Sequence, residues 1–155
     1  TQAALLSEHY GIPAISTGDI FRNSCDQALR LFHQAGFPKE MLLMGAAFYS
    51  RKWENVKDRY HGFLQYTEKG GGYGPNYDEL AEKYIDKNGY VSYWDDEAKA
   101  PFLFNGSTFI SYDDERSLSC KCKYVKEEGI GGIFYWCHTG DTSGVLLRKI
   151  GEEIR

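Results

Sequence analysis

Apolar positions in this chain switch between helical spacing and short continuous runs. Over residues 28–35 they recur at helical spacing, and Gly36 is a typical stop signal. Ser24 and Gln27 form a capping-box signature, which predicts that this helix begins at Ser24. An uninterrupted apolar run over 41–48 follows and predicts a strand buried on both faces, as in a parallel sheet.

The pattern changes between about residues 54 and 107. Glycines cluster over 70–74 and indicate a loop, and 78–86 has the spacing of a short amphipathic helix. The segments 90–94 and 101–104 favour antiparallel strands. We therefore expect a small α+β insertion.

The last third returns to the first pattern. Asp113 or Asp114 is placed to cap a helix that ends at about Gly129, 133–136 is a second buried strand, and 143–154 has the pattern of a final helix. Alternating helices and apolar strands predict βαβ units with parallel pairing. Two parallel strands leave open edges, so we expect neighbouring strands and, overall, part of a barrel.

Composition narrows the function classes. A chain of 155 residues suits one domain but is too short for a complete eight-unit α/β barrel, which needs about 200 residues. The net charge of −4 argues against a nucleic-acid-binding surface, and no apolar run approaches the roughly 20 residues of a membrane span. The four cysteines lack paired Cys-x-x-Cys spacing, so we expect neither a metal site nor a cofactor. The chain begins with Thr1, and its compartment is unknown from sequence.

Four ordered segments carry a family resemblance, and they include the motifs Phe48-Tyr49-Ser50-Arg51 and Gly131-Gly132-Ile133-Phe134-Tyr135-Trp136. The family is glycoside hydrolase family 18, the chitinase-like enzymes. Its seventh strand is resembled by segment 43–51 and its small inserted domain by segment 93–102. Its return to the barrel is resembled by segment 109–121 and its eighth strand by segment 131–136. The resemblance implies an α/β fold: a partial (β/α)8 TIM barrel of the last strands and helices, with a small α+β insertion domain. Ser50 stands where that family usually has Gly.

By this resemblance, three side chains would contact substrate. Trp136 would form the floor beneath the sugar at the cleavage position, and Tyr49 and Arg51 would contact the same sugar or its neighbour. Carboxyl ends of barrel strands face the active-site mouth, so we expect the three side chains to converge there. An indole offers an apolar face, and a guanidinium donates to acetamide or hydroxyl oxygens. The alternative role for Trp136 is an ordinary core residue.

The catalytic acid of the family is missing. Its catalytic strand carries Asp-x-x-Asp-x-Asp-x-Glu, a spacing that does not occur here, and the consecutive acids at 95–97 and 113–115 suit loops and helix caps. We predict no catalytic residue and no hydrolysis by this chain, whereas the parent would hydrolyse β-1,4-linked N-acetylglucosamine polymers by substrate-assisted catalysis. The alternative is a non-catalytic chitin- or oligosaccharide-binding protein. Expected partners are chitin or N-acetylglucosamine oligosaccharides, and either the missing barrel half or a second copy; the parent family is often secreted.

Residues 1–22 resemble adenylate kinases instead. Thr1-Gln2 matches the residues that follow the phosphate-binding loop of that family, and the segment 14–19 matches the sequence that leads into its AMP-contacting helix. The resemblance implies that Thr17 and Arg22 would touch AMP. No Gly-x-x-x-x-Gly-Lys loop occurs, so phosphoryl transfer is not expected. We predict that 1–22 is a foreign or fused piece and 23–155 the hydrolase part. The rival interpretation is that 1–22 is an unusual stretch of the hydrolase that matches by coincidence, and a nucleotide kinase remnant is a less favoured function.

Overall fold

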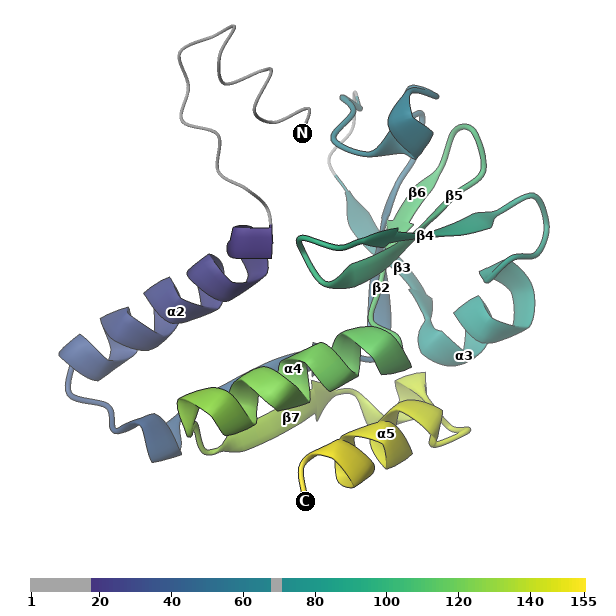
Figure 1. Ribbon diagram of the computed structural model, residues 1–155. Helices are drawn as coiled ribbons and strands as arrows, with labels where there is room; N and C mark the ends of the chain where they lie inside the picture. Colours follow the sequence, from purple (N-terminus) through teal and green to yellow (C-terminus); the bar gives the residue numbers. More distant parts are fainter. Residues whose placement is uncertain (1–17, 68–70) are drawn as a thin grey trace, which may run out of the picture.

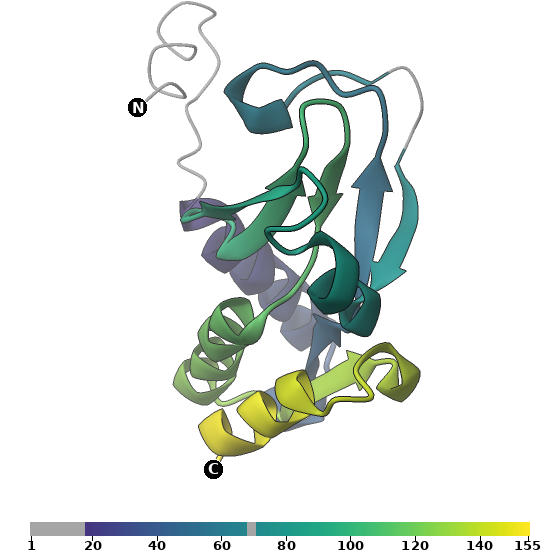
Figure 2. The ribbon, with the colours of Figure 1, turned by 90° about the vertical axis from the view of Figure 1, so that its right-hand side faces the viewer.

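The computed structural model describes residues 18–67 and 71–155, which form two sheets with helices around them (Figure 1). In both ribbon views the five-stranded sheet lies at the top, and the two-stranded sheet lies at the bottom with its helices (Figures 1 and 2). Most of the segment that resembles adenylate kinases, including Thr17, lies outside the described residues. None of the helices in the described part of the chain is long and apolar enough to span a bilayer.

The two-stranded sheet is the barrel-like part. β1 (Leu43–Ala47) and β7 (Gly132–Trp136) pair in parallel, with Ala47 opposite Trp136, as predicted from the apolar runs. Side chains alternate along each strand, so one face packs on α4 (Glu115–Glu128) and α5 (Val145–Glu153). The opposite face carries Phe134 and Trp136, which are largely exposed.

The second sheet is antiparallel, in the order β3-β2-β6-β5-β4. It extends beyond the predicted insertion of 54–107 at both ends, because the chain leaves the barrel-like sheet at Phe48. The buried Phe48 donates its N–H to the Trp136 carbonyl, and its own carbonyl accepts from the Tyr77 N–H. The five strands are β2 (Tyr49–Trp53), β3 (Gly72–Asn76), β4 (Val91–Asp95), β5 (Ala100–Phe104) and β6 (Phe109–Ser111).

One core joins the two sheets. The predicted helix of 78–86 is a short turn α3 (Tyr77–Glu79) continued by a wider π-helical turn η3 (Leu80–Tyr84), and it packs over the five-stranded sheet. Three single turns complete the secondary structure of the described residues: η1 (Lys39–Met41), η2 (Tyr60–Gly62) and η4 (His138–Gly140). The buried cluster comprises Ala46, Phe48, Tyr77, Leu80, Leu103, Ile110, Tyr112, Leu118, Cys122, Leu146 and Ile150.

The ends of α4 confirm the local prediction. Asp114 and Ser117 form a reciprocal capping box, and Gly129 takes the left-handed conformation that ends many helices. The predicted start of the first helix was wrong, because α2 (Gly18–Gln34) begins before Ser24. Tertiary contacts account for the extension: the ring of Phe21 lies 5.9 Å from that of Tyr124 on α4.

Candidate functional site

Trp136 ends β7 at the carboxyl edge of the two-stranded sheet. Its carbonyl accepts the Phe48 N–H at 2.8 Å, and the rings of Phe48 and Tyr135 stack at 4.6 Å on the opposite face. The Trp136–Cys137 peptide bond is cis. Trp136 is 67% exposed, which argues against a core role in this chain. Its indole is therefore available to a ligand or to a neighbouring part of a barrel.

Tyr49 and Arg51 lie on one face of β2 because side chains alternate along a strand. The structure brings both against a third residue, Tyr73, on the neighbouring edge strand β3. The Arg51 guanidinium lies 5.0 Å from the Tyr73 ring centroid, and the Tyr49 and Tyr73 rings meet edge to face at 5.4 Å. Arg51 also donates to the Gly71 carbonyl at 3.2 Å. The result is a cationic and aromatic platform at the surface, which we call the Tyr49–Arg51–Tyr73 platform.

Sequence reasoning missed Tyr73. It stands among glycines and beside Pro75, a composition that indicates a loop, yet it is 76% exposed on a strand directly opposite Arg51. The signal that could have found Tyr73 is its position opposite Arg51, a predicted ligand-binding residue. That position is known only once the pairing of β3 with β2 is known.

The register of the five-stranded sheet continues the platform across the molecule. Arg51 pairs with Tyr73 on one side and with Ser111 on the other; Ser111 pairs with Phe102, and Phe102 with Tyr93. Residues directly opposite one another share a face, so these five side chains form one row over all five strands.

A shallow hollow of about 400 Å³ lies beside the platform. Its lining includes Tyr49, Arg51 and Ser111, together with Asp113 and Lys121. Trp136 is not part of this lining, so the structure brings two of the three predicted residues together. The expected convergence of Trp136 with them stays a prediction.

Asp113 and Lys121 form a buried ion pair against the free edge of β1. The Asp113 carboxylate accepts from the Ala47 N–H at 2.9 Å, from the Ser117 hydroxyl at 2.8 Å and from the Lys121 ammonium. Lys121 also donates to the Gly45 carbonyl at 3.2 Å. With its oxygens committed to these donors and paired with a cation, Asp113 is not arranged to donate a proton to a substrate.

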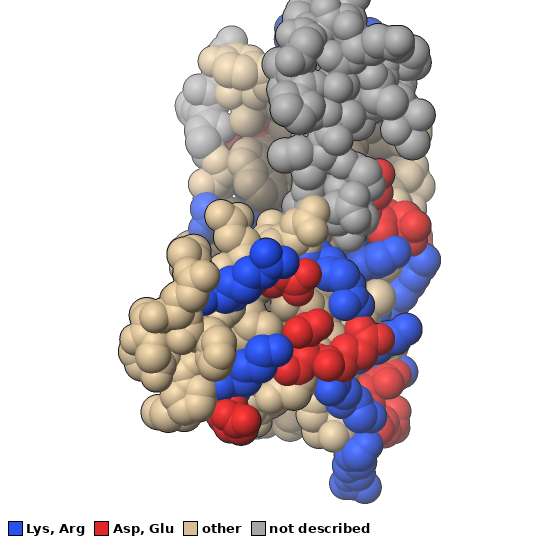
Figure 3. Space-filling model, turned by 60° about the vertical axis from the view of Figure 1, so that its left-hand side comes forward, with Lys and Arg blue, Asp and Glu red and all other residues tan. Residues whose placement is uncertain are grey.

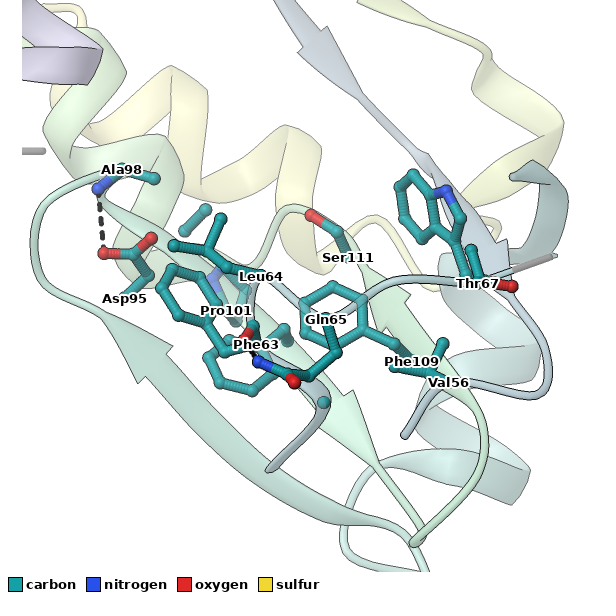
Figure 4. Close-up of a pocket in the computed structure, with 14 residues that line it drawn as sticks. Val56, Phe63, Leu64, Gln65, Thr67, Asp95, Ala98, Pro101, Phe109 and Ser111 are labelled. Atoms are coloured by element: carbon teal, nitrogen blue, oxygen red, sulfur yellow. Dashed lines mark hydrogen bonds between the residues drawn. The ribbon is translucent and has the colours of Figure 1, made fainter. Parts of the chain in front are cut away.

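A second hollow, of about 390 Å³, lies over the aromatic half of the same sheet face (Figure 4). Val56, Phe63 and Leu64 come from the loop after β2, and Pro101 and Phe109 from the sheet; the close-up shows these side chains around a common space. Its lining is mostly apolar, with Gln65, Thr67, Asp95 and Ser111 as the polar residues.

Buried tyrosines and surface charges do not add acid–base chemistry. Burial raises the pKa of the Tyr77 phenol to about 12 and also raises the pKa of Tyr112, so both stay neutral at physiological pH. Positive and negative side chains intermingle on the face shown in Figure 3. The Arg22–Glu127 pair joins α2 to α4, and the Lys39–Glu128 pair joins η1 to α4. Arg22 therefore serves helix packing here. In the described ranges no cluster of three His, Cys, Asp or Glu side chains is arranged to hold a metal ion.

Comparisons with known proteins agree on one family. The family model described as Glycosyl hydrolases family 18 matches residues 4–141, a range that includes most of the segment that resembles adenylate kinases. The chain is 37% identical over 128 residues to chitinase A1 of Niallia circulans and 37% identical over 120 residues to a probable endochitinase of Caenorhabditis elegans. These matches cover 77% and 72% of this chain but only 18% and 19% of the two relatives.

Solved structures extend the likeness to the fold. A family 18 N-acetylglucosaminidase from Paenibacillus barengoltzii is 49% identical with a TM-score of 0.80, over 83% of this chain and 38% of that one. Chitinase ChiW from a Paenibacillus strain is 41% identical with a TM-score of 0.75, over 83% of this chain and 15% of that one. The described elements are accordingly a fragment of a TIM-barrel-type fold.

Proposed function

Because the chain belongs to glycosyl hydrolase family 18, we propose that it is the C-terminal, sugar-binding part of a chitinase-like domain. The parent would hydrolyse β-1,4-linked N-acetylglucosamine polymers. The relatives that support this substrate are named chitinase and N-acetylglucosaminidase, and both names refer to enzymes that act on N-acetylglucosamine units. The observation that carries the proposal is the Tyr49–Arg51–Tyr73 platform beside the ends of the parallel strands, in which Tyr73 and Arg51 are exposed and Tyr49 is half-buried.

The platform suits an N-acetylated sugar in its chemistry. A pyranose presents C–H groups on its faces, which pack against aromatic rings, while its hydroxyl and acetamide oxygens accept hydrogen bonds. The Arg51 guanidinium lies over the Tyr73 ring and donates one N–H to the Gly71 carbonyl, so its other N–H groups can donate to ligand oxygens. Trp136 supplies a further exposed ring at the end of β7 and is proposed as the floor of the cleavage subsite.

Hydrolysis needs a group that this chain does not supply. In substrate-assisted cleavage the acetamide oxygen attacks the anomeric carbon while a protein acid protonates the leaving oxygen. The sequence has no Asp-x-x-Asp-x-Asp-x-Glu, and the buried Asp113 beside the platform is tied to a cation. We therefore propose that the isolated chain binds sugar without cleaving it.

The open face of the barrel-like sheet is proposed to receive the remaining barrel. Phe134 and Leu43 are exposed on this sheet, and an apolar groove of about 370 Å³ lies between α2 and β1. A parallel two-stranded sheet with such surfaces requires cover, which the preceding part of a family 18 domain would provide. A second copy is the alternative occupant.

Calorimetry with N-acetylglucosamine tetrasaccharide tests the sugar-binding proposal. We expect wild type to bind, Arg51→Ala to lose at least about tenfold in affinity, and Trp136→Ala to lose a comparable amount. Tyr66→Ala is the matched control, because Tyr66 is equally aromatic and exposed but lies outside the platform. Absence of binding by wild type, or an equal loss in the control, contradicts the proposal.

A non-catalytic chitin-binding protein is the second candidate. The observation that favours it is that the sequence has no Asp-x-x-Asp-x-Asp-x-Glu motif to supply the catalytic acid. The two candidates predict different outcomes for the chain joined to its upstream sequence. Chitin hydrolysis by that longer protein supports the enzyme, whereas binding without hydrolysis supports the binding protein. Hydrolysis by the 155-residue chain itself would contradict the claim that it lacks the acid.

A further inference from the structure

Aromatic side chains from the five-stranded sheet and from the loop after β2 form the hollow over the aromatic half of that sheet. Phe102 and Phe109 stack with ring centroids 4.9 Å apart, and Phe63 from the covering loop stacks on Phe102 at 5.5 Å. Trp53 meets Phe109 edge to face at 5.9 Å, and Leu64 forms the rim with 83% of its surface exposed. These rings come from three strands and one loop, so the hollow belongs to the folded sheet rather than to a single flexible segment.

Polar groups around this hollow are mostly engaged within the protein. Asp95 accepts from the backbone N–H groups of Glu97 and Ala98, and the Gln65 amide nitrogen donates to the Phe63 carbonyl. The Ser111 hydroxyl is different, because it has no hydrogen-bond partner among residues 18–67 and 71–155. The site therefore offers a large apolar surface and one free hydroxyl, a common composition for small-molecule pockets.

The hollow is continuous with the Tyr49–Arg51–Tyr73 platform. Ala98, Ala100 and Ser111 line both the aromatic hollow and the hollow beside Arg51. Ser111 stands between Arg51 and Phe102 in the cross-strand row, so its hydroxyl lies at the junction. A ligand of two joined groups can place one group on the platform and the other over the phenylalanines.

We propose that the aromatic hollow binds a flat apolar group, an aryl ring, attached to the sugar that occupies the platform. A second sugar fits this hollow poorly, since each pyranose carries several hydroxyls that would lose water and find few partners. An aryl ring loses little hydration and gains contact with the Phe102, Phe109 and Trp53 side chains. The attachment to a sugar rests on the proposed function, whereas the affinity of the hollow for an aryl group does not.

Three ligands test separately the affinity of the hollow for an aryl group and the attachment of that group to a sugar. Calorimetry on the full chain compares methyl 1-thio-N-acetyl-β-glucosaminide, its p-nitrophenyl counterpart and free p-nitrophenol; the thio linkage resists cleavage. We expect the aryl glycoside to bind about tenfold more tightly than the methyl glycoside. Measurable binding of both glycosides by wild type with equal affinity overturns the proposal.

A charge at the rim tests the position of the aryl ring. Leu64→Asp places a carboxylate beside the apolar surface, and the fold should tolerate it because Leu64 is exposed and its φ of 53° suits Asp. We expect this variant to lose the aryl preference and to bind the methyl glycoside as wild type does. Tyr66→Asp adds the same charge two residues away, outside the hollow, and should keep the preference.

The outcomes distinguish this proposal from the sugar function. An aryl preference that falls equally in Leu64→Asp and Tyr66→Asp refutes the hollow as its source. Binding of p-nitrophenol that Leu64→Asp abolishes supports the hollow even where neither glycoside binds, and that result counts against the sugar function alone.

Discussion

Replacing Lys121 with Met should destabilise the chain far more than a surface lysine change. Lys121 leaves only 17% of its side chain exposed and Asp113 only 7%, so the pair is largely withdrawn from water. Removing the ammonium leaves the Asp113 carboxylate buried with two remaining donors, the Ala47 N–H and the Ser117 hydroxyl. It also leaves the Gly45 carbonyl without the Lys121 donor.

The magnitude follows from the cost of an uncompensated buried charge. Breaking a buried ion pair by removing one partner costs about 3–5 kcal/mol, and the two remaining donors to Asp113 place the expected loss near the lower bound, at about 3 kcal/mol. With a urea m-value of about 2 kcal/mol/M, the unfolding midpoint should fall by about 1.5 M. Lys123→Met on the same helix is the matched control. Lys123 is 74% exposed and faces Glu127 at 3.7 Å, so we expect a loss of about 0.5 kcal/mol or less.

Urea unfolding followed by tryptophan fluorescence and circular dichroism measures both variants. A double-mutant cycle with Asp113→Asn then isolates the pairwise energy, which should reach at least about 1 kcal/mol for residues in direct contact. Equal losses in Lys121→Met and Lys123→Met, or strict additivity in the cycle, would refute the reasoning that the buried pair fixes the edge of β1.

Three further predictions concern other buried or hydrogen-bonded groups. Asp141→Ala should cost about 2 kcal/mol in urea unfolding, because the buried carboxylate accepts the Leu146 N–H at 2.8 Å in the first turn of α5. Asp141→Asn should cost less because it keeps one acceptor oxygen, and unchanged stability in Asp141→Ala would contradict the capping role. Hydrogen bonds from the Thr142 side chain and backbone lower the pKa of Asp78 in the folded state. Asp78 therefore stabilises the fold at pH values above its unfolded-state pKa, which is near 3.9, and this stabilisation is lost as pH falls through the lower folded-state pKa. Asp78→Asn should flatten the acid side of the stability profile, and an unchanged slope would count against this linkage. Burial raises the pKa of Tyr77 to about 12, so stability should decline as pH rises from about 10, and ultraviolet titration of Tyr77→Phe should lack one late-ionising phenol.

Local rules predicted the elements whose ends are fixed by their own residues. The capping box of Asp114 with Ser117 and the left-handed Gly129 define α4 within the sequence itself. The parallel pairing of β1 with β7 followed from two apolar runs separated by helical segments. In these places the short-range signal and the tertiary structure agree.

Elements set by distant contacts were outside the reach of such rules. The chain leaves the barrel-like sheet at Phe48 because its backbone bonds both to Trp136 and to Tyr77, residues that no local window contains. The early start of α2 depends on packing against Tyr124, just over a hundred positions away from Phe21. Tyr73 joins the candidate site only through the pairing of β3 with β2.

Ser50 shows how the register of β2 determines the candidate site. A one-residue slip of this strand would turn Tyr49 and Arg51 to the opposite face of the sheet. Ser50, between them, is almost fully buried, and its hydroxyl donates to the Pro75 carbonyl at 2.7 Å, a contact that a slipped strand could not make. The serine at this position therefore supplies a hydrogen bond that holds β2 to β3. The same bond keeps Arg51 opposite Tyr73, so the geometry of the platform depends on a residue that no ligand would touch.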